Sequence, residues 1–109
     1  MTARRVVEFL EQNGVSPFSR WFKSLEPVAA AKVTAALYRL EQGNTSNVKA
    51  VGNGVAEYRI DFGPGYRIYL GQDGKTLVIL LGGGTKKGQS ADIRRAQTRW
   101  QQFKATKKR

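Results

Sequence analysis

Residues 55–81 read VAEYRIDFGPGYRIYLGQDGKTLVILL, and apolar side chains alternate with polar ones along most of this segment. In the first run, Glu57 and Arg59 share one face of a strand, and the aromatic and aliphatic residues share the other. Gly-Pro-Gly at 63–65 and the Asp-Gly pair at 73–74 are turn signals that separate this run from two more. The period of two therefore predicts consecutive antiparallel strands.

The N-terminal half has a different pattern. Residues 6–10 form a short apolar run with β-branched side chains, which predicts a first strand. Ser16 before a proline predicts a helix over 17–25, and a second proline predicts another helix over 27–42. Two helices joined this closely indicate a helical hairpin. Residues 43–54 are polar and rich in glycine and asparagine, so we expect a connector there.

After the last apolar run, residues 82–89 contain four glycines and two lysines, and we expect a loop. Ser90 is suited to cap a final helix, and the apolar spacing predicts that this helix continues to residue 103. Residues 104–109 carry lysine and arginine without an apolar stripe, which predicts a basic tail.

These elements define an α+β fold. We expect a short N-terminal strand and a helical hairpin packed on a twisted antiparallel sheet of about four strands, followed by a C-terminal helix. Residues 1–103 form one domain in this interpretation, and residues 104–109 form a basic C-terminal tail.

Composition narrows the possible chemistry. The chain has 109 residues with no cysteine and no histidine, which removes thiolate metal sites and the commonest general base. No segment reaches the roughly 20 apolar residues that a membrane span needs, and no signal-peptide pattern is present. We therefore expect a cytoplasmic location, no membrane partner, no metal and no cofactor.

Positive charge is concentrated in the second part of the chain. Residues 1–43 carry six basic and four acidic side chains, a net of +2, while residues 44–109 carry thirteen and four, a net of +9. Lysine and arginine that neutralise phosphates gain free energy from counterion release, so this asymmetry favours a polyanion, with RNA as the preferred partner. A protein that is merely basic is the alternative.

The expected sheet supplies one candidate site. If the alternation holds across neighbouring strands, Arg59, Arg67 and Tyr69 share the outer face of the sheet. Two guanidinium groups can bind phosphate oxygens, and a tyrosine can stack on a base or donate a hydrogen bond. The alternative is an exposed strand face on which Arg59 pairs with Glu57 or Asp61.

The glycine-rich segment supplies a second candidate. Gly82-Gly83-Gly84 precedes a helix but lacks the spacing of a P-loop, so the glycines are interpreted as a sharp turn. Lys86 and Lys87 follow directly, where their ammonium groups could bind a phosphate.

Four segments occur in an order that resembles a known family: Glu-Tyr-Arg at 57–59, Gly-Pro-Gly-Tyr-Arg-Ile-Tyr at 63–69, Leu-Leu-Gly-Gly-Gly-Thr-Lys-Lys-Gly-Gln at 80–89, and Asp-Ile-Arg-Arg-Ala at 92–96. The series is similar to phage-related addiction-module killer proteins, a HigB-like branch of the RelE/ParE toxin superfamily. The resemblance covers about residues 5–103.

This resemblance implies the toxin of a type II toxin–antitoxin pair, neutralised by a helix-turn-helix antitoxin. Many relatives are ribosome-dependent mRNA endonucleases that direct the ribose 2′-hydroxyl at the adjacent phosphate. Arg59 and Arg67 match basic strand positions of the superfamily, and Lys86 matches the lysine after a Gly-Gly-Asp segment. Thr85 stands where that aspartate is usual. The C-terminal catalytic His or Tyr of some relatives has no counterpart, so the general base is not assigned.

We therefore expect Arg59, Arg67 and Lys86 to be catalytic. The residues expected to bind substrate are Lys87, Gln89, Tyr69, Arg94, Arg95 and Arg99. The expected partners are the cognate antitoxin, mRNA and ribosomal RNA. Two alternatives stay open: a ParE-like inhibitor of DNA gyrase, and an RNA-binding module without catalysis.

Overall fold

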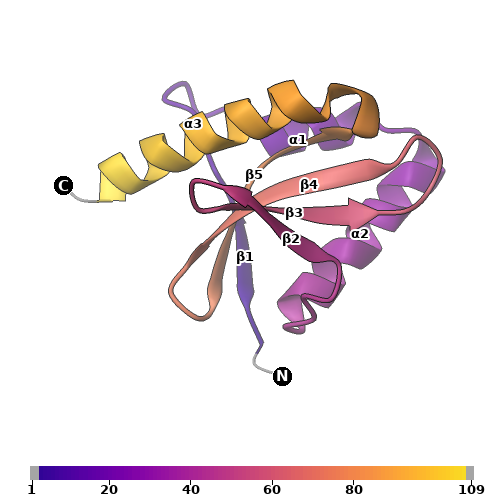
Figure 1. The fold of residues 1–109 in the computed structure, drawn as a ribbon, viewed down its shortest axis with the longest axis horizontal. Helices are drawn as coiled ribbons and strands as arrows, with labels where there is room; N and C mark the ends of the chain where they lie inside the picture. Colours follow the sequence, from indigo (N-terminus) through magenta and orange to yellow (C-terminus); the bar gives the residue numbers. More distant parts are fainter. Residues whose placement is uncertain (1–2, 108–109) are drawn as a thin grey trace.

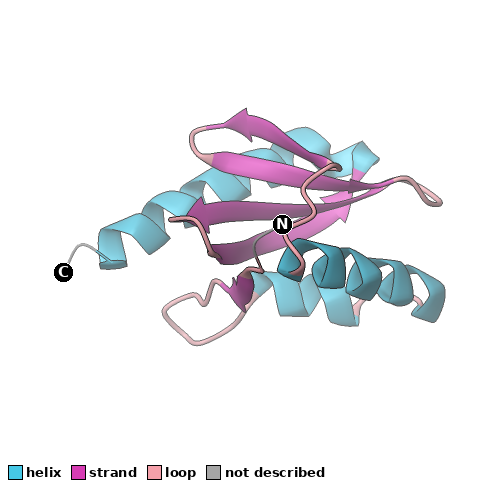
Figure 2. Ribbon diagram, turned by 90° about the horizontal axis from the view of Figure 1, so that it is seen from below, coloured by secondary structure: helices cyan, strands magenta, loops and turns pink. Residues whose placement is uncertain are grey.

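A computed structural model describes residues 3–107 and confirms the α+β class (Figure 1). The elements of this part of the chain are β1 (Arg5–Glu8), α1 (Pro17–Lys23), α2 (Pro27–Glu41), β2 (Val48–Gly52), β3 (Val55–Ile60), β4 (Tyr66–Asp73), β5 (Leu77–Thr85), the 3₁₀ turn η1 (Lys86–Gly88) and α3 (Gln89–Lys107). The strands form one sheet, with α1 and α2 on one face and α3 on the other (Figure 2).

The sheet differs from the expected one in size and direction. Within residues 3–107 it has five strands, in the order β1-β5-β4-β3-β2, where about four were expected. All neighbours are antiparallel except β1 and β5, which run parallel with Arg5 opposite Leu77. The helical hairpin carries the chain from one edge of the sheet to the other, so the first strand lies beside the last. Local periodicity contains no information about that long-range pairing.

Capping side chains and prolines set the starts of the two N-terminal helices. The Ser16 hydroxyl accepts a hydrogen bond from the Ser19 amide at 3.0 Å, and the Glu26 carboxylate accepts one from the Ala29 amide at 2.9 Å. Each cap satisfies an amide that lacks a partner within its own helix. The predicted hairpin is confirmed, with α1 and α2 ending two residues and one residue earlier than expected.

The predicted connector at 43–54 is wrong in its second half, because residues 48–52 form β2. The strand pairs with β3 through a tight turn at Asn53 and Gly54, whose φ angles are 54° and 82°. Asn-Gly is the strongest short signal for this kind of hairpin turn. The small and polar residues around this turn do not show the apolar alternation from which a strand is predicted.

The glycines at 82–84 do not form the expected loop, because they continue β5 to Thr85. A Cβ on Gly83 would overlap the ring of Trp21, and a Cβ on Gly84 would overlap the carboxylate of Asp92. Successive residues of a strand face opposite sides, so these glycines let α1 approach one face and α3 the other. The glycines are required for packing and not for a turn.

Gly83→Ala is expected to lower the free energy of unfolding by about 1–3 kcal/mol, because the added methyl group has to displace the Trp21 ring. Gly88→Ala is the matched control, because its Cβ would meet only the end of the Asp92 side chain at 3.2 Å. Urea denaturation of both variants measures the difference. Equal stability of the two variants would contradict this account.

Helix α3 differs from the expectation at both ends. It follows η1 directly, so Ser90 lies inside its first turn and does not cap it. At the other end, residues 104–107 of the expected tail are helical, and the Lys107 ammonium pairs with Asp73. That ion pair and the continuous backbone hydrogen bonding extend the helix; residues 108–109 of the expected tail lie outside the described residues.

Each face of the sheet has its own core. Phe18, Val33 and Tyr58 belong to the cluster under α1 and α2, while Tyr69 and Trp100 belong to the cluster under α3. Because both faces are covered, polar residues that alternate toward α3 are buried as well. None of the described helices combines the length and apolar character required to cross a bilayer.

Candidate functional site

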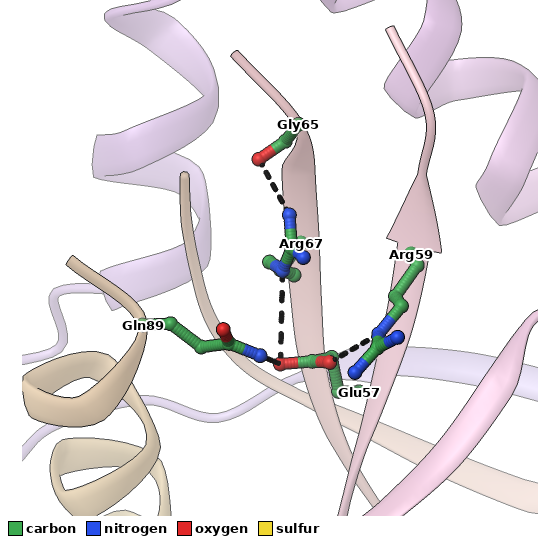
Figure 3. Close-up of polar contacts among 5 residues, drawn as sticks. All are labelled: Glu57, Arg59, Gly65, Arg67 and Gln89. Atoms are coloured by element: carbon green, nitrogen blue, oxygen red, sulfur yellow. Dashed lines mark hydrogen bonds and ion pairs between the residues drawn. The ribbon is translucent and has the colours of Figure 1, made fainter. Parts of the chain in front are cut away.

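The carboxylate of Glu57 is the centre of a buried polar cluster at the N-terminal end of α3 (Figure 3). Glu57 is 0% exposed. Its Oε1 accepts a hydrogen bond from Nε of Arg59 at 2.8 Å, and its Oε2 accepts one from Nε2 of Gln89 at 2.8 Å. Nε of Arg67 lies 3.9 Å from Oε2. Three side chains from three elements therefore converge on one buried negative charge.

Strand register brings the cluster together. Arg59 lies directly opposite Arg67 in the pairing of β3 with β4, and Glu57 lies directly opposite Tyr69. The prediction that the two arginines share a face is confirmed. Like charges directly opposite each other destabilise a sheet. The carboxylate of Glu57 offsets this repulsion, because both guanidinium groups face it.

Arg67 is held from its other side by the turn before β4. Its Nη1 donates to the carbonyl oxygen of Gly65 at 2.9 Å, and the backbone amide of Lys86 donates to the same oxygen at 2.9 Å. This carbonyl therefore links the arginine to the first residue of η1. Arg67 is only 8% exposed, so most of its guanidinium group is unavailable to a ligand.

The accessible cations of this region come from two elements. The Arg59 side chain is 46% exposed although its Nε is bound to Glu57, and Lys86 and Lys87 are exposed on η1. Within residues 3–107, no group of three or more carboxylates is placed so that it could hold a metal ion. What the arrangement offers is a cationic edge of the sheet, suited to oxygen atoms of an anion.

Tyr69, which the sequence predicts to bind substrate, is buried in the structure. It is 1% exposed beneath α3, so its hydroxyl is not presented at the surface. Burial raises the pKa of its hydroxyl above the usual value, and the negative charge of Glu57 raises the pKa further. Among the described residues the hydroxyl has no hydrogen-bond partner. Alternation placed it on the correct face, but that face is covered.

Tyr69→Phe is therefore expected to leave function unchanged and to change stability by less than about 1 kcal/mol at pH 7, because the hydroxyl makes no hydrogen bond. The pKa of Tyr69 is higher in the folded state than the value of about 10 in the unfolded chain. Its contribution to stability is thus complete below pH 10 and lost as the pH rises further. Thermal melts from pH 8 to 11 should show a steeper alkaline loss in the wild type than in the variant. Parallel curves would contradict this assignment.

The three arginines of α3 make none of the described polar contacts with Glu57. With Glu11 they line a separate hollow of about 360 Å³ beside the helix. Arg99 donates to the carbonyl of Leu81 at 3.0 Å, and burial lowers the pKa of its guanidinium. Arg95 forms an ion pair within the helix, and Arg94 is exposed. The structure thus brings together only part of the expected set.

Glu57 is the residue that sequence reasoning missed. The sequence indicates it only as a possible partner of Arg59 on an exposed strand face; the pairing is confirmed, but the carboxylate is buried. The signal available in the sequence is a carboxylate inside an apolar strand that precedes an amphipathic helix. Such a residue is buried only when the helix covers its face, and it then requires partners.

The layered fold and the cationic edge define a small α+β protein whose accessible side chains favour an anionic ligand. The chain belongs to the Gp49-like family: the family described as "Phage derived protein Gp49-like (DUF891)" matches residues 20–101. This family is toxin-like and related to RelE. A protein of Haemophilus influenzae, described as uncharacterized, is 44% identical over 81 residues, which cover 73% of this chain and 82% of the relative.

Proposed function

We propose that this protein is the toxin of a type II toxin–antitoxin pair and that it cleaves mRNA on the ribosome. The observation that carries the proposal is the facing pair of guanidinium groups, Arg59 and Arg67, held by the buried carboxylate of Glu57. Membership of a toxin-like family related to RelE supports the same conclusion, and a net charge of +11 favours a polyanionic substrate.

The proposed reaction uses the hydroxyl of the substrate as its nucleophile. The ribose 2′-oxygen attacks the adjacent phosphorus, and the bond from phosphorus to the 5′-oxygen breaks. The products are a 2′,3′-cyclic phosphate and a 5′-hydroxyl. Negative charge builds on the non-bridging oxygens in the transition state, and preorganised cations stabilise it. In our proposal the exposed N–H groups of Arg59 contact these oxygens. Arg67, which is buried beside Arg59, adds positive electrostatic potential without contacting the phosphate.

A proton has to leave the 2′-hydroxyl, and another has to reach the departing 5′-oxygen. We assign this proton transfer to Lys86, whose side chain is exposed. The backbone amide of Lys86 and the guanidinium group of Arg67 both donate hydrogen bonds to the Gly65 carbonyl, which places the two residues side by side. Lys87 is exposed beside it and positions the RNA backbone. Gln89 donates a hydrogen bond to Glu57, so in this proposal it positions the cluster and does not contact the substrate directly.

The proposal includes two partners besides the mRNA: an antitoxin and ribosomal RNA. Within this family we place the protein in the HigB-like branch, with a helix-turn-helix antitoxin as its inhibitor. Arg94 and Arg95, exposed on α3 and outside the described contacts of the cluster, provide general attraction to ribosomal RNA. Arg99 contributes less, because it is committed to the carbonyl of Leu81.

Inducible expression in a bacterial host, with and without the neighbouring small gene, tests this function. We expect growth arrest that the neighbouring gene relieves, and discrete mRNA ends by primer extension that disappear when translation is blocked. Growth arrest with intact mRNA would contradict the nuclease proposal.

A gyrase inhibitor is the second candidate, and two observations favour it. The chain has no histidine, and Glu57 already pairs with Nε of both guanidinium groups that catalysis would use. A protein that binds its target without cutting RNA needs no proton-transferring residue. DNA damage with SOS induction in the same experiment would support this candidate.

A further inference from the structure

A hollow of about 260 Å³ lies on the α2 side of the Arg59 side chain. Its lining includes Lys32 and Arg39 of α2, Arg59 of β3, and Asn47, Asp61 and Phe62. Nothing in the proposed reaction uses this hollow, although Arg59 forms one of its walls.

The hollow is open because β3 is longer than its neighbour. The carbonyl of Asn47 accepts a hydrogen bond from the Arg59 amide at 3.1 Å, just before β2 begins. Beyond this point, β3 has no described strand on its outer side. Arg59 therefore lies at a free edge, where a ligand that contacts it can continue around the edge toward α2.

The charge of the hollow favours an anion. Lys32 and Arg39 are seven residues apart on one face of α2, which separates them by about 10.5 Å along the helix axis. Neither of them forms an ion pair with a carboxylate among residues 3–107. Together with Arg59 they give three cations against the single carboxylate of Asp61.

An aromatic ring orients one of these cations, the ammonium group of Lys32. The Lys32 ammonium lies 5.1 Å from the centre of the Phe62 ring, and Phe62 stacks on Tyr66 with ring centres 6.4 Å apart. A cation over an aromatic face is weakly held when solvent reaches it, so Lys32 is oriented but still able to bind an anion.

We propose that this hollow binds a phosphate–ribose unit of an RNA strand, adjacent to the phosphate held at Arg59. Its volume lies below the usual range of about 300–1,000 Å³ for complete small-molecule sites, which suits one backbone unit of a longer chain. The RNA then runs from η1 across Arg59 and over the free edge of β3 to α2. This inference deepens the proposed function, because it extends the substrate path of the same site.

The test measures binding of a labelled, short single-stranded RNA by fluorescence anisotropy over a range of salt concentrations. The double variant Lys32→Ala/Arg39→Ala is expected to bind about tenfold more weakly at low salt. The slope of log affinity against log salt should fall by about 0.7, because the variant loses the one phosphate contact of the hollow. Both residues are exposed on a helix, where alanine preserves the backbone.

The matched control is Arg5→Ala/Lys75→Ala, which removes one arginine and one lysine near the opposite end of the sheet. It is expected to change the salt slope by much less. Asp61→Asn, which removes the one carboxylate of the hollow, is expected to tighten binding. Because net charge alone predicts the same direction for Asp61→Asn, the comparison with Arg5→Ala/Lys75→Ala is what separates a local site from general loss of charge.

Equal salt slopes for the two double variants would overturn the inference, even if the wild type cleaves RNA and the proposed function stands. A reduced slope specific to Lys32 and Arg39, in a protein that never cleaves RNA, would support the inference while the nuclease proposal fails. Absence of RNA binding by the wild type would overturn the inference, whereas the nuclease proposal is tested separately by the induction experiment on translating cells. Loss of antitoxin binding with unchanged RNA binding would assign the hollow to a protein partner and overturn the inference.

Discussion

Glu57→Ala is expected to lower the free energy of unfolding by about 3–5 kcal/mol, a large part of the roughly 5–15 kcal/mol that is typical of a folded domain. The variant removes the only carboxylate that the Arg67 side chain faces among the described ion pairs. Arg67 is 8% exposed, so its charge cannot recover full hydration. It would also lie directly opposite Arg59 with nothing between the two guanidinium groups. Urea and thermal denaturation measure the loss.

Glu57→Gln is the matched control for this prediction. The amide fills the same volume and keeps one oxygen as an acceptor, so it retains part of the hydrogen bonding while removing the charge. We expect its stability to lie between those of the wild type and Glu57→Ala. Asp61→Ala, at an exposed position just after the end of β3, should change stability by less than about 1 kcal/mol. An alanine variant at Glu57 as stable as the one at Asp61 would show that the cluster does not stabilise the fold.

Local signals were sufficient for much of the fold. The period of two predicted correctly which residues of β3 and β4 share a face of the sheet. Tyr58 lies in the core under α1 and α2, and Glu57 lies on the opposite face, under α3. The Ser16 cap and the prolines located the helix starts. These features depend on residues that are close in sequence, which is why a sequence pattern contains them.

Features that depend on distant residues were missed. Position 83 within β5 requires a glycine because Trp21, far away in sequence, occupies the space where a side chain would lie. The parallel pairing of β1 with β5 depends on the path of the helical hairpin. Neither relation leaves a local signal, so a glycine run was interpreted as a turn and the sheet as purely antiparallel.

The same distinction applies to the candidate site. The shared face of Arg59 and Arg67 follows from alternation and is confirmed. How deeply each residue on that face is buried depends on the position of α3 over the sheet, and no local sequence pattern predicts that position. Tyr69 under the helix is therefore buried, whereas Arg59 at the free edge remains 46% exposed. Of the two arginines, Arg59 is the one a substrate can reach.

Arg59→Ala is accordingly expected to lower the rate of RNA cleavage about 10²- to 10³-fold, the usual effect of removing one preorganised donor from a transition state. Arg67→Ala is a poorer test, since it also breaks the hydrogen bond to Gly65 and leaves Glu57 with fewer partners. At Arg59 the structural cost is one charged hydrogen bond, about 1.5–3 kcal/mol, and Glu57 keeps Gln89. Growth arrest after induction and cleavage of mRNA by the purified protein on translating ribosomes measure the effect.

Arg59→Lys separates the charge from the geometry. A lysine preserves the positive charge but cannot donate to Glu57 and to a phosphate through one planar group, as a guanidinium does. We therefore expect Arg59→Lys to keep most of the affinity for RNA while recovering only a small part of the cleavage rate. Lys75→Ala, at the far turn of the sheet, should cleave like the wild type. If a folded Arg59→Ala protein still arrests growth and cuts mRNA at the wild-type rate, the facing arginines are a structural pair around Glu57 and catalysis lies elsewhere.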